Sequence, residues 1–451
     1  MNQTSKVLNF IQNTTFEDLP KSVVDYAQDC LFDTLGIAAA ASKTKLSTIV
    51  ANHAARHFGA GELGPATLMF DGRTASPVGA ALAGGMSIDS LDGHDGFALA
   101  KGHIGAALVP ALLAASETLG SDAGEGSGRT FLTNLVIGYE IASRAGLALH
   151  DSVSDYHTSG AWNSLGCAAV VGRLLELDNE QMRHALGIAE YHGPRSQMMR
   201  VIDHASMLKD GSGWGAMAGT SAAFLAADGF TGAPAITVEA EEVSHFWEDL
   251  GDRWCILEQN FKAYPVCRWA QPSMEAAMSA LKSAGKSYQD ISAIEIQTFH
   301  EATRLASPNP KDMDEAQYSI AFPVAALLVH GQIGAIEIDG DNLTHPEVLR
   351  LSNMIQMSER KDFNDVFPTE RFSAVKLTFA DGSSVLSEPH RPKGDPGVTT
   401  LHRADLIGKL QRLASPIVGE ERAKAIVGQS LAMHGENAKL VDLTAHLNKR
   451  P

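Results

Sequence analysis

Small apolar residues at helical spacing dominate the first part of this chain. From Pro20 to about Leu257, apolar positions recur about every 3.6 residues, and Gly, Ser, Asp and Pro mark the breaks. The segments IGAALVPALLAAS and GCAAVVGRLL are apolar on nearly every side, which predicts helices enclosed by other helices. Because alanine and glycine let helix backbones approach closely, we expect a compact all-helical domain. The predicted helices lie near residues 20–41, 46–58, 77–91, 104–119, 130–149, 160–176, 179–190 and 214–228.

A change of pattern after about residue 270 predicts a second domain. The chain has 451 residues, above the usual limit of about 250 to 300 for a single core. Residues 291–299 and 372–379 alternate apolar and polar side chains as strands do, and the turn pair Asp381-Gly382 of a hairpin follows the second. Helical stretches at 319–330 and 345–351 lie between these strands, which is typical of an α+β domain.

The C-terminal residues return to a helical pattern. From about residue 402 the chain is helical again, and we expect this tail to pack back onto the first domain. The sequence therefore predicts a mainly α protein. Its large helical domain spans residues 1–265 and is completed by 402–451, and its smaller α+β domain spans residues 266–401.

The composition excludes several classes of partner. A formal net charge of −17 argues against nucleic acid, whose phosphates need a basic surface, so any cations that bind an anion must be gathered locally. No apolar run approaches the ~18 residues that cross a bilayer, and the N-terminus has no secretory signal pattern. We therefore expect a cytoplasmic protein. The four cysteines form no CxxC pair and no zinc-type spacing, which indicates buried free thiols.

The densest group of ionisable residues lies in the segment SIDSLDGHDGFALAKGHIGAALVP, residues 87–110. Charged groups beside a buried segment lose hydration unless they are paired or used, and such crowding shifts pKa values toward working pH. The segment is typical of an active-site loop. A polar loop between two helices, with His103 as a cap, is the alternative. The six residues are Asp89, Asp92, His94, Asp95, Lys101 and His103.

Two further clusters precede apolar helices. His157 lies just before a predicted helix N-terminus, where backbone N–H groups favour an anion. Lys209 lies in the Gly-rich turn KDGSGWG, whose glycines allow a ligand to approach the backbone. The order of these residues is not that of a phosphate loop, so nucleotide binding is not expected. A structural histidine and a solvated lysine are the alternatives.

Two other clusters carry cations or a phenol. Lys262 and Arg268 flank a Tyr-Pro turn, where they could clamp a carboxylate, with the arginine binding it in bidentate fashion. A solvated pair of surface cations is the alternative. Tyr318 opens an apolar helix and could donate a proton or a hydrogen bond, although Ser319 as an N-cap also explains that motif.

Seven motifs along the chain form a set. They are LFDTLGIAAAA, KGHIGAALVPALLA, GYEIASRAG, LGCAAVVGRLLELD, KDGSGWGAMAGTSAAFLAADGFTGAP, FKAYPVCRW and AQYSIAFPVAALL. The most specific features are GFTG after an Ala-rich helix and K-x-Y-P-x-C. In this order, and over nearly the whole chain, the motifs resemble the MmgE/PrpD family, which includes dehydratases, decarboxylases and epimerases of small polycarboxylates.

The resemblance implies a large helical domain with a smaller α+β domain as its lid, a homodimer, and no metal or organic cofactor. It also implies a cleft between the domains that takes a small polycarboxylate. By position, the functional residues would be Asp92, Asp95, His103, His157, Lys209, Lys262 and Tyr318. We assign catalysis to all of these except Lys262, and substrate binding to Lys262 together with His94, Lys101 and Arg268.

The reactions of this family share the removal or return of a proton at a carbon next to a carboxylate. Such a step needs cations or hydrogen-bond donors to stabilise the carbanion and a base within about 3 Å. His103 and His157 could exchange the proton, with Asp92 or Asp95 orienting them. Lys209, Lys262 and Arg268 could supply positive charge.

Departures from the family pattern bear on the type of reaction. Where relatives commonly show consecutive aspartates, this chain has Asp92-Gly93-His94-Asp95, and Ile104 replaces a usual proline. Gln271 stands where many relatives carry histidine. These changes favour epimerisation of the iminodisuccinate type over dehydration of the 2-methylcitrate type, with decarboxylation of the cis-aconitate type third. A non-catalytic carboxylate-binding protein is the alternative from another class.

Overall fold

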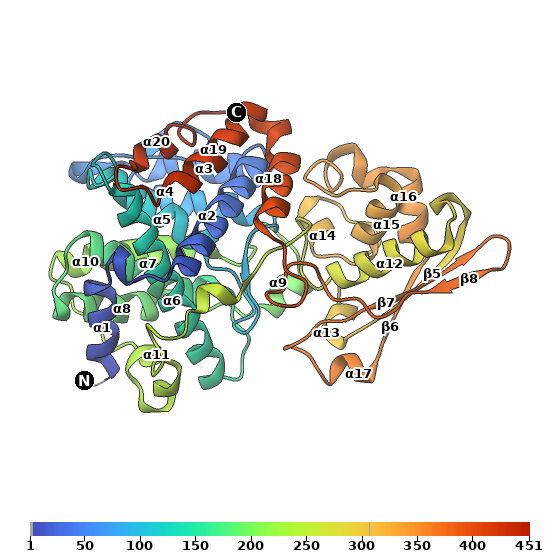
Figure 1. Ribbon diagram of the computed structural model, residues 1–451, viewed down its shortest axis with the longest axis horizontal. Coiled ribbons are helices and arrows are strands. Elements are labelled where there is room, and N and C mark those ends of the chain that lie inside the picture. Colours follow the sequence, from blue (N-terminus) through green and yellow to red (C-terminus); the bar gives the residue numbers. More distant parts are fainter. Residues whose placement is uncertain (1–2, 306) are drawn as a thin grey trace.

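The computed structural model describes residues 3–305 and 307–451, and it consists of a large helical domain and a smaller domain built on a mixed sheet (Figure 1). This confirms the predicted mainly α fold class. The helices of the first part are α1 (Gln3–Asn13), α2 (Lys21–Ala41), α3 (Lys45–His57), α4 (Pro77–Asp89), α5 (Gly105–Thr118), α6 (Ser127–Ser152), α7 (Gly160–Leu174), α8 (Asn179–His192), α9 (Met199–Asp203), α10 (Ser212–Ala227) and α11 (Ile236–Glu239).

The central helices of the large domain are α4, α5, α7 and α10, and small residues bring them together. A Cβ atom at Gly85 of α4 would lie 2.5 Å from the Cα of Gly213 in α10, so neither backbone could carry a larger side chain there. The start of α4 follows from local chemistry, because the Ser76 side chain accepts a hydrogen bond from the Gly79 N–H and Pro77 occupies the first turn. Close backbone packing therefore buries α4, α5 and α7 on nearly every side, whereas α10 keeps one face with Trp214 and Leu225 exposed.

The smaller domain is built on a four-stranded sheet with the order β6-β5-β7-β8. Strands β7 (Ala374–Phe379) and β8 (Ser384–Leu386) form the expected hairpin, in which Leu377 pairs with Val385. Strand β6 (Ile355–Glu359), which the sequence analysis did not predict, pairs in parallel with β5 (Ile291–Thr298). The helices of this domain are α12 (Gln271–Ala284), α13 (His300–Thr303), α14 (Met313–Gln317), α15 (Ala321–His330), α16 (Pro346–Ser352) and α17 (Lys361–Asn364).

Two short strand pairs lie in the helical domain. Strand β1 (Ala66–Thr67) pairs with β2 (Thr74–Ala75), and β3 (Gly96–Phe97) pairs with β4 (Gln259–Asn260). The second pair joins the ionisable loop to the segment that leads into the smaller domain. Among the described helices, none is both long and apolar enough to span a bilayer.

The C-terminal helices are α18 (Arg403–Val418), α19 (Glu420–Ala432) and α20 (Leu440–Thr444), and they lie against the helical domain (Figure 1). Helix α18 packs on α2, where a Cβ at Gly36 would lie 2.7 Å from the side chain of Leu410. The buried Lys409 of α18 donates to Asp33 Oδ1 at 2.7 Å and to the Gly93 carbonyl oxygen at 2.6 Å. The tail therefore contacts the ionisable loop directly.

We predict that Lys409→Met lowers the free energy of unfolding by about 3–5 kcal/mol, because it leaves the Asp33 carboxylate buried without its cation. Urea denaturation followed by circular dichroism measures this change. Lys424→Met is the matched control, since Lys424 pairs with Glu420 on the exposed face of α19 and such a pair contributes at most about 1 kcal/mol. Equal losses in the two variants would contradict the structural role given to Lys409.

Candidate active site

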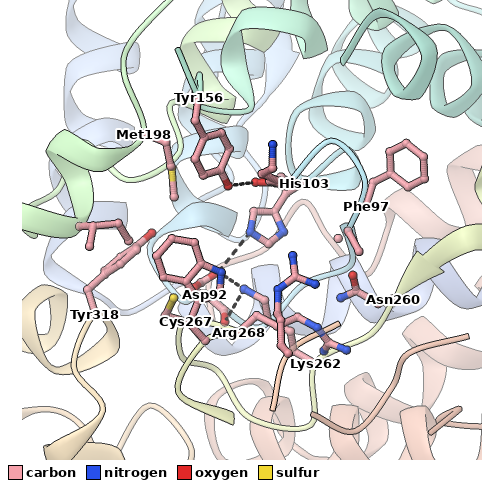
Figure 2. Close-up of a pocket in the computed structure, with 17 residues that line it drawn as sticks. Asp92, Phe97, His103, Tyr156, Met198, Asn260, Lys262, Cys267, Arg268 and Tyr318 are labelled. Atoms are coloured by element: carbon pink, nitrogen blue, oxygen red, sulfur yellow. Dashed lines mark hydrogen bonds and ion pairs between the residues drawn. The ribbon is translucent and has the colours of Figure 1, made fainter. Parts of the chain in front are cut away.

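A pocket with a cavity volume of about 60 Å³ lies where the ionisable loop faces the smaller domain. Figure 2 shows His103 and Tyr156 above Asp92, with Tyr318 at one side and Lys262 and Arg268 below. The helical domain and the segment after β4 supply most of the lining, and the smaller domain supplies Tyr318 and Arg371. The lining residues are Asp92, Gly96, Phe97, Ala98, Lys101, Gly102, His103, Tyr156, Met198, Ile202, Asn260, Lys262, Cys267, Arg268, Trp269, Tyr318 and Arg371.

The loop that carries His103 is held in a tight turn. The Phe97 N–H donates to the Gly102 carbonyl at 2.7 Å, and a Cβ at Gly102 would lie 2.4 Å from Ser159 Oγ. Lys101 adopts a φ of 56°, and Lys209 adopts a φ of 49°. Such left-handed backbone is costly for residues other than glycine and is concentrated at functional sites. The surrounding contacts therefore hold both lysines in defined positions.

The hydrogen bonds of His103 define its tautomer. Its Nδ1 lies 2.6 Å from the Asp95 carbonyl oxygen, which can only accept, so Nδ1 carries the proton. In the neutral ring Nε2 is then the basic nitrogen, and it lies 3.6 Å from Asp92 Oδ1 and 3.6 Å from Asp210 Oδ2. Burial lowers the pKa of His103 to about 4, and the nearby Lys262 ammonium adds to this effect. His103 is therefore a neutral base at pH 7.

The two carboxylates beside His103 have opposite protonation behaviour. Burial raises the pKa of Asp92, but its ion pair with Lys262 and the nearby His103 outweigh this and hold it well below the usual range. Burial raises the pKa of Asp210 to about 6, an effect that His103 only partly offsets. The Asp92 carboxylate is therefore ionised throughout the ordinary pH range, whereas the Asp210 carboxylate takes up a proton near pH 6.

Several predicted residues lie behind the lining rather than in it. The Asp95 carboxylate accepts a hydrogen bond from the Tyr139 hydroxyl at 3.0 Å, and His94 packs edge-on against the His103 ring with centroids 4.5 Å apart. Lys209 pairs with Asp314 at 2.6 Å and lies 5.3 Å from the centre of the Tyr318 ring. These residues support the groups that line the pocket.

His157 is not among the residues that line the pocket. Its backbone N–H donates to His150 Nε2 at 3.2 Å, and it forms an isolated β-bridge with Gln197. Of the predicted site residues, Asp92, Lys101, His103, Lys262, Arg268 and Tyr318 meet at the pocket.

Four polar residues of the lining were not predicted. Tyr156 precedes the predicted His157, Cys267 lies within the motif FKAYPVCRW, and the β3–β4 pairing brings Asn260 opposite Gly96. Arg371 comes from the smaller domain, just before β7, and no motif marks it. A lone arginine before a strand carries no sequence signal that separates it from a surface residue.

Gln271 does not contribute to the pocket. Its side chain is fully buried and donates to the carbonyl oxygens of Tyr264 and Val266 at 3.0 and 3.2 Å. Position 271 therefore lies outside the pocket lining in this protein.

One group of side chains has the composition of a metal site. Potential ligand atoms of Asp92, His94 and His103 lie within 4.8 Å of one another. The Lys262 ammonium already pairs with Asp92 Oδ1, however, and a metal cation at this position would have to displace it. The charges of the described residues therefore do not favour a metal ion here.

Comparisons with known proteins cover nearly the whole chain. Residues 5–246 match the model of the MmgE/PrpD N-terminal domain, and residues 264–433 match that of the MmgE/PrpD C-terminal domain. The chain is 23% identical to cis-aconitate decarboxylase of Aspergillus terreus, over 94% of this chain and 91% of that protein. It is 25% identical to 2-methylcitrate dehydratase of Cupriavidus necator, over 83% and 82% of the two chains. It is 24% identical to human cis-aconitate decarboxylase, over 68% and 66%. With its pocket formed between two domains that both match, this chain belongs to the MmgE/PrpD family.

Proposed function

We propose that this protein is an enzyme that moves a proton at the carbon next to a carboxylate of a small polycarboxylate, using only its own side chains. The observation that carries this proposal is the neutral His103, whose basic Nε2 lies at a pocket lined by Lys101, Lys262, Arg268 and Arg371. A carbon acid of this kind needs a base and nearby positive charge together. The names of the relatives, which are decarboxylases and dehydratases of such acids, support the same substrate class.

His103 acts as the base in the proposed step. Because its Nδ1–H is held by the Asp95 carbonyl, Nε2 accepts the substrate proton and the ring becomes an imidazolium. The carboxylate of Asp210, 3.6 Å from Nε2, stabilises that cation. Cationic side chains of the lining stabilise the negative charge that develops on the substrate carboxylate.

Tyr318 is the second proton carrier. Burial raises the pKa of its hydroxyl well above the ordinary value, and Asp92 adds to this effect, so the group stays protonated and can donate. Tyr318 comes from the smaller domain and His103 from the helical domain, on different sides of the pocket (Figure 2). Two such groups that flank one carbon can invert it or can assist the departure of a neighbouring group.

Two outcomes of this step are the leading candidates. Epimerisation, as in an iminodisuccinate epimerase, results if Tyr318 returns the proton to the opposite face, and the altered loop Asp92-Gly93-His94-Asp95 favours it. Loss of water results if the carbanion expels a β-hydroxyl, which leaves as water with a proton from Tyr318. In a decarboxylation the C–C bond to a carboxylate breaks instead, carbon dioxide leaves, and the carbanion that remains takes up a proton from Tyr318. The names of the full-length relatives favour this lyase outcome.

One experiment assigns the reaction. The protein is incubated in D₂O with iminodisuccinate, methylcitrate or cis-aconitate, and the products are followed by NMR. We expect deuterium at the carbon next to a carboxylate in one of these acids. Inversion without loss of a group identifies an epimerase, loss of water a hydro-lyase, and release of carbon dioxide a decarboxylase. Binding of these acids without any exchange would instead show a non-catalytic carboxylate-binding protein.

The pKa values of the site predict the pH dependence of turnover. As the pH falls, Asp210 takes up a proton near pH 6 and no longer stabilises the imidazolium, and His103 itself is protonated near pH 4. We therefore expect kcat/KM for the exchanging acid to fall below about pH 6 and again near pH 4. Asp210→Asn should lower the rate and remove the upper step while the lower step remains.

The same assay tests the base. His103→Ala should lower kcat by about 10²- to 10⁴-fold, the usual contribution of a general base. His330→Gln is the control, since His330 is also partly buried with a lowered pKa but lies outside the pocket lining. A pH profile of Asp210→Asn identical to that of the parent, or a His103→Ala variant that turns over normally, would refute these roles.

A further inference from the structure

Arg371 is a buried cation without an acidic partner. Only 6% of the residue is exposed, and its Nε has no hydrogen-bond partner. Its terminal nitrogens form no hydrogen bond or ion pair with any residue in the described part of the chain, and its one close contact of note is with the Phe367 ring, 5.8 Å away. A guanidinium keeps its charge at all ordinary pH values, so burial without a counter-ion is costly.

Other buried arginines of this protein show what a structural role requires. The terminal nitrogens of Arg144 donate to the carbonyl oxygens of Phe246 at 2.6 Å and Arg253 at 2.8 Å, and Arg144 also pairs with Asp249. Arg268 donates to two carbonyl oxygens and pairs with Asp395. Arg371 has no comparable partners among the described residues. The Asp395 carboxylate acts on it only from beyond ion-pair distance and is itself paired with Arg268.

Lys101 is a second cation of the lining without an ion-pair partner among the described residues, although it is only half-buried. It comes from the loop of the helical domain, and its Nζ lies 5.1 Å from the centre of the Tyr156 ring with no carboxylate in ion-pair distance among the described residues. The Tyr156 hydroxyl donates to the Lys101 carbonyl, which helps to hold this left-handed residue in place. Burial lowers the pKa of Lys101, and the charge of Arg371 lowers it further, which indicates that the two cations lie close enough to repel each other.

The other two cations of the lining have ion-pair partners. Lys262 is balanced by Asp92, and Arg268 is balanced by Asp395. Arg371 and Lys101 remain without an ion-pair partner among the described residues, and the Asp395 carboxylate that acts on Arg371 is already paired with Arg268. A ligand with a second anionic group would neutralise them.

We propose that Arg371 and Lys101 form a subsite for a carboxylate of the substrate that takes no part in the chemistry. This inference rests on the proposed function and names the residues that set its specificity. Arg371 binds this carboxylate through the two parallel hydrogen bonds that a guanidinium can offer, and Lys101 adds a point charge. The substrate therefore carries at least two carboxylates, one beside the carbon that faces His103 and one remote from it.

The two residues come from different domains. Lys101 belongs to the helical domain and Arg371 to the smaller one, so the remote carboxylate bridges them. A monocarboxylate leaves the repulsion between the cations in place and is bound more weakly. The pocket therefore selects between acids by the number of carboxylates they carry as well as by their shape.

Calorimetric titration at fixed ionic strength tests the subsite, with butyrate, succinate and tricarballylate as probes. We expect the parent protein to bind succinate and tricarballylate at least about 10-fold more tightly than butyrate. Arg371→Gln should weaken the binding of the di- and tricarboxylate by about 10- to 100-fold, as expected for the loss of hydrogen bonds to a charged group, and should change butyrate binding little. Lys101→Met should act in the same direction.

Arg360→Gln is the matched control, because Arg360 lies in the same domain and stacks on an aromatic ring but pairs with Asp362 at the surface. Circular dichroism confirms that each variant is folded, and Lys101→Met decides the question should Arg371→Gln fail to fold. An unchanged ratio of succinate to butyrate affinity in the folded variants would overturn the subsite even if isotope exchange occurs. Conversely, the variants could lose the preference for succinate over butyrate while the parent protein shows no isotope exchange with any acid. That result would retain the subsite and refute the proposed function.

Discussion

Lys262 and Asp92 form an ion pair that is almost fully withdrawn from water, with 1% and 7% of the two side chains exposed. Loss of either partner would leave an uncompensated buried charge, so the pair ties the ionisable loop to the segment after β4. The Lys262 charge also acts on two neighbours. It holds the pKa of Asp92 down and adds to the burial that lowers the pKa of His103. The same interaction therefore shapes the loop and keeps the proposed base neutral.

Around this pair the two domains contribute different chemistry. The helical domain supplies the imidazole of His103 together with the carboxylates of Asp92 and Asp210, whose pKa values burial and local charge separate. The smaller domain supplies a phenol, Tyr318, and an unpartnered guanidinium, Arg371. Neither domain alone holds both a base and a second proton carrier. The pocket is therefore a property of the way the domains meet.

Features that depend on residues close together in the sequence could be predicted from the sequence. The buried helices follow from apolar side chains on all faces, and Asp92, Lys101 and His103 lie within one loop of the chain. Strand β6 escaped prediction although Ile355–Glu359 alternates apolar and polar residues, because the strand is short and none of its side chains is fully buried. Arg371 escaped because its place in the lining depends on what lies opposite it in space. The place of Gln271 outside the lining was equally hidden, since its amide donates to backbone carbonyls that only the fold brings near.

Lys409 donates to the carbonyl of Gly93, next to Asp92, although 316 positions separate the two residues in the chain. During synthesis on the ribosome, the loop is complete long before α18 emerges, and its final contact forms only when that helix docks on α2. A nascent chain that has completed both the helical and the sheet-containing segments still lacks this anchor. Residues from both ends of the described chain must therefore be in place before this part of the loop has all its contacts.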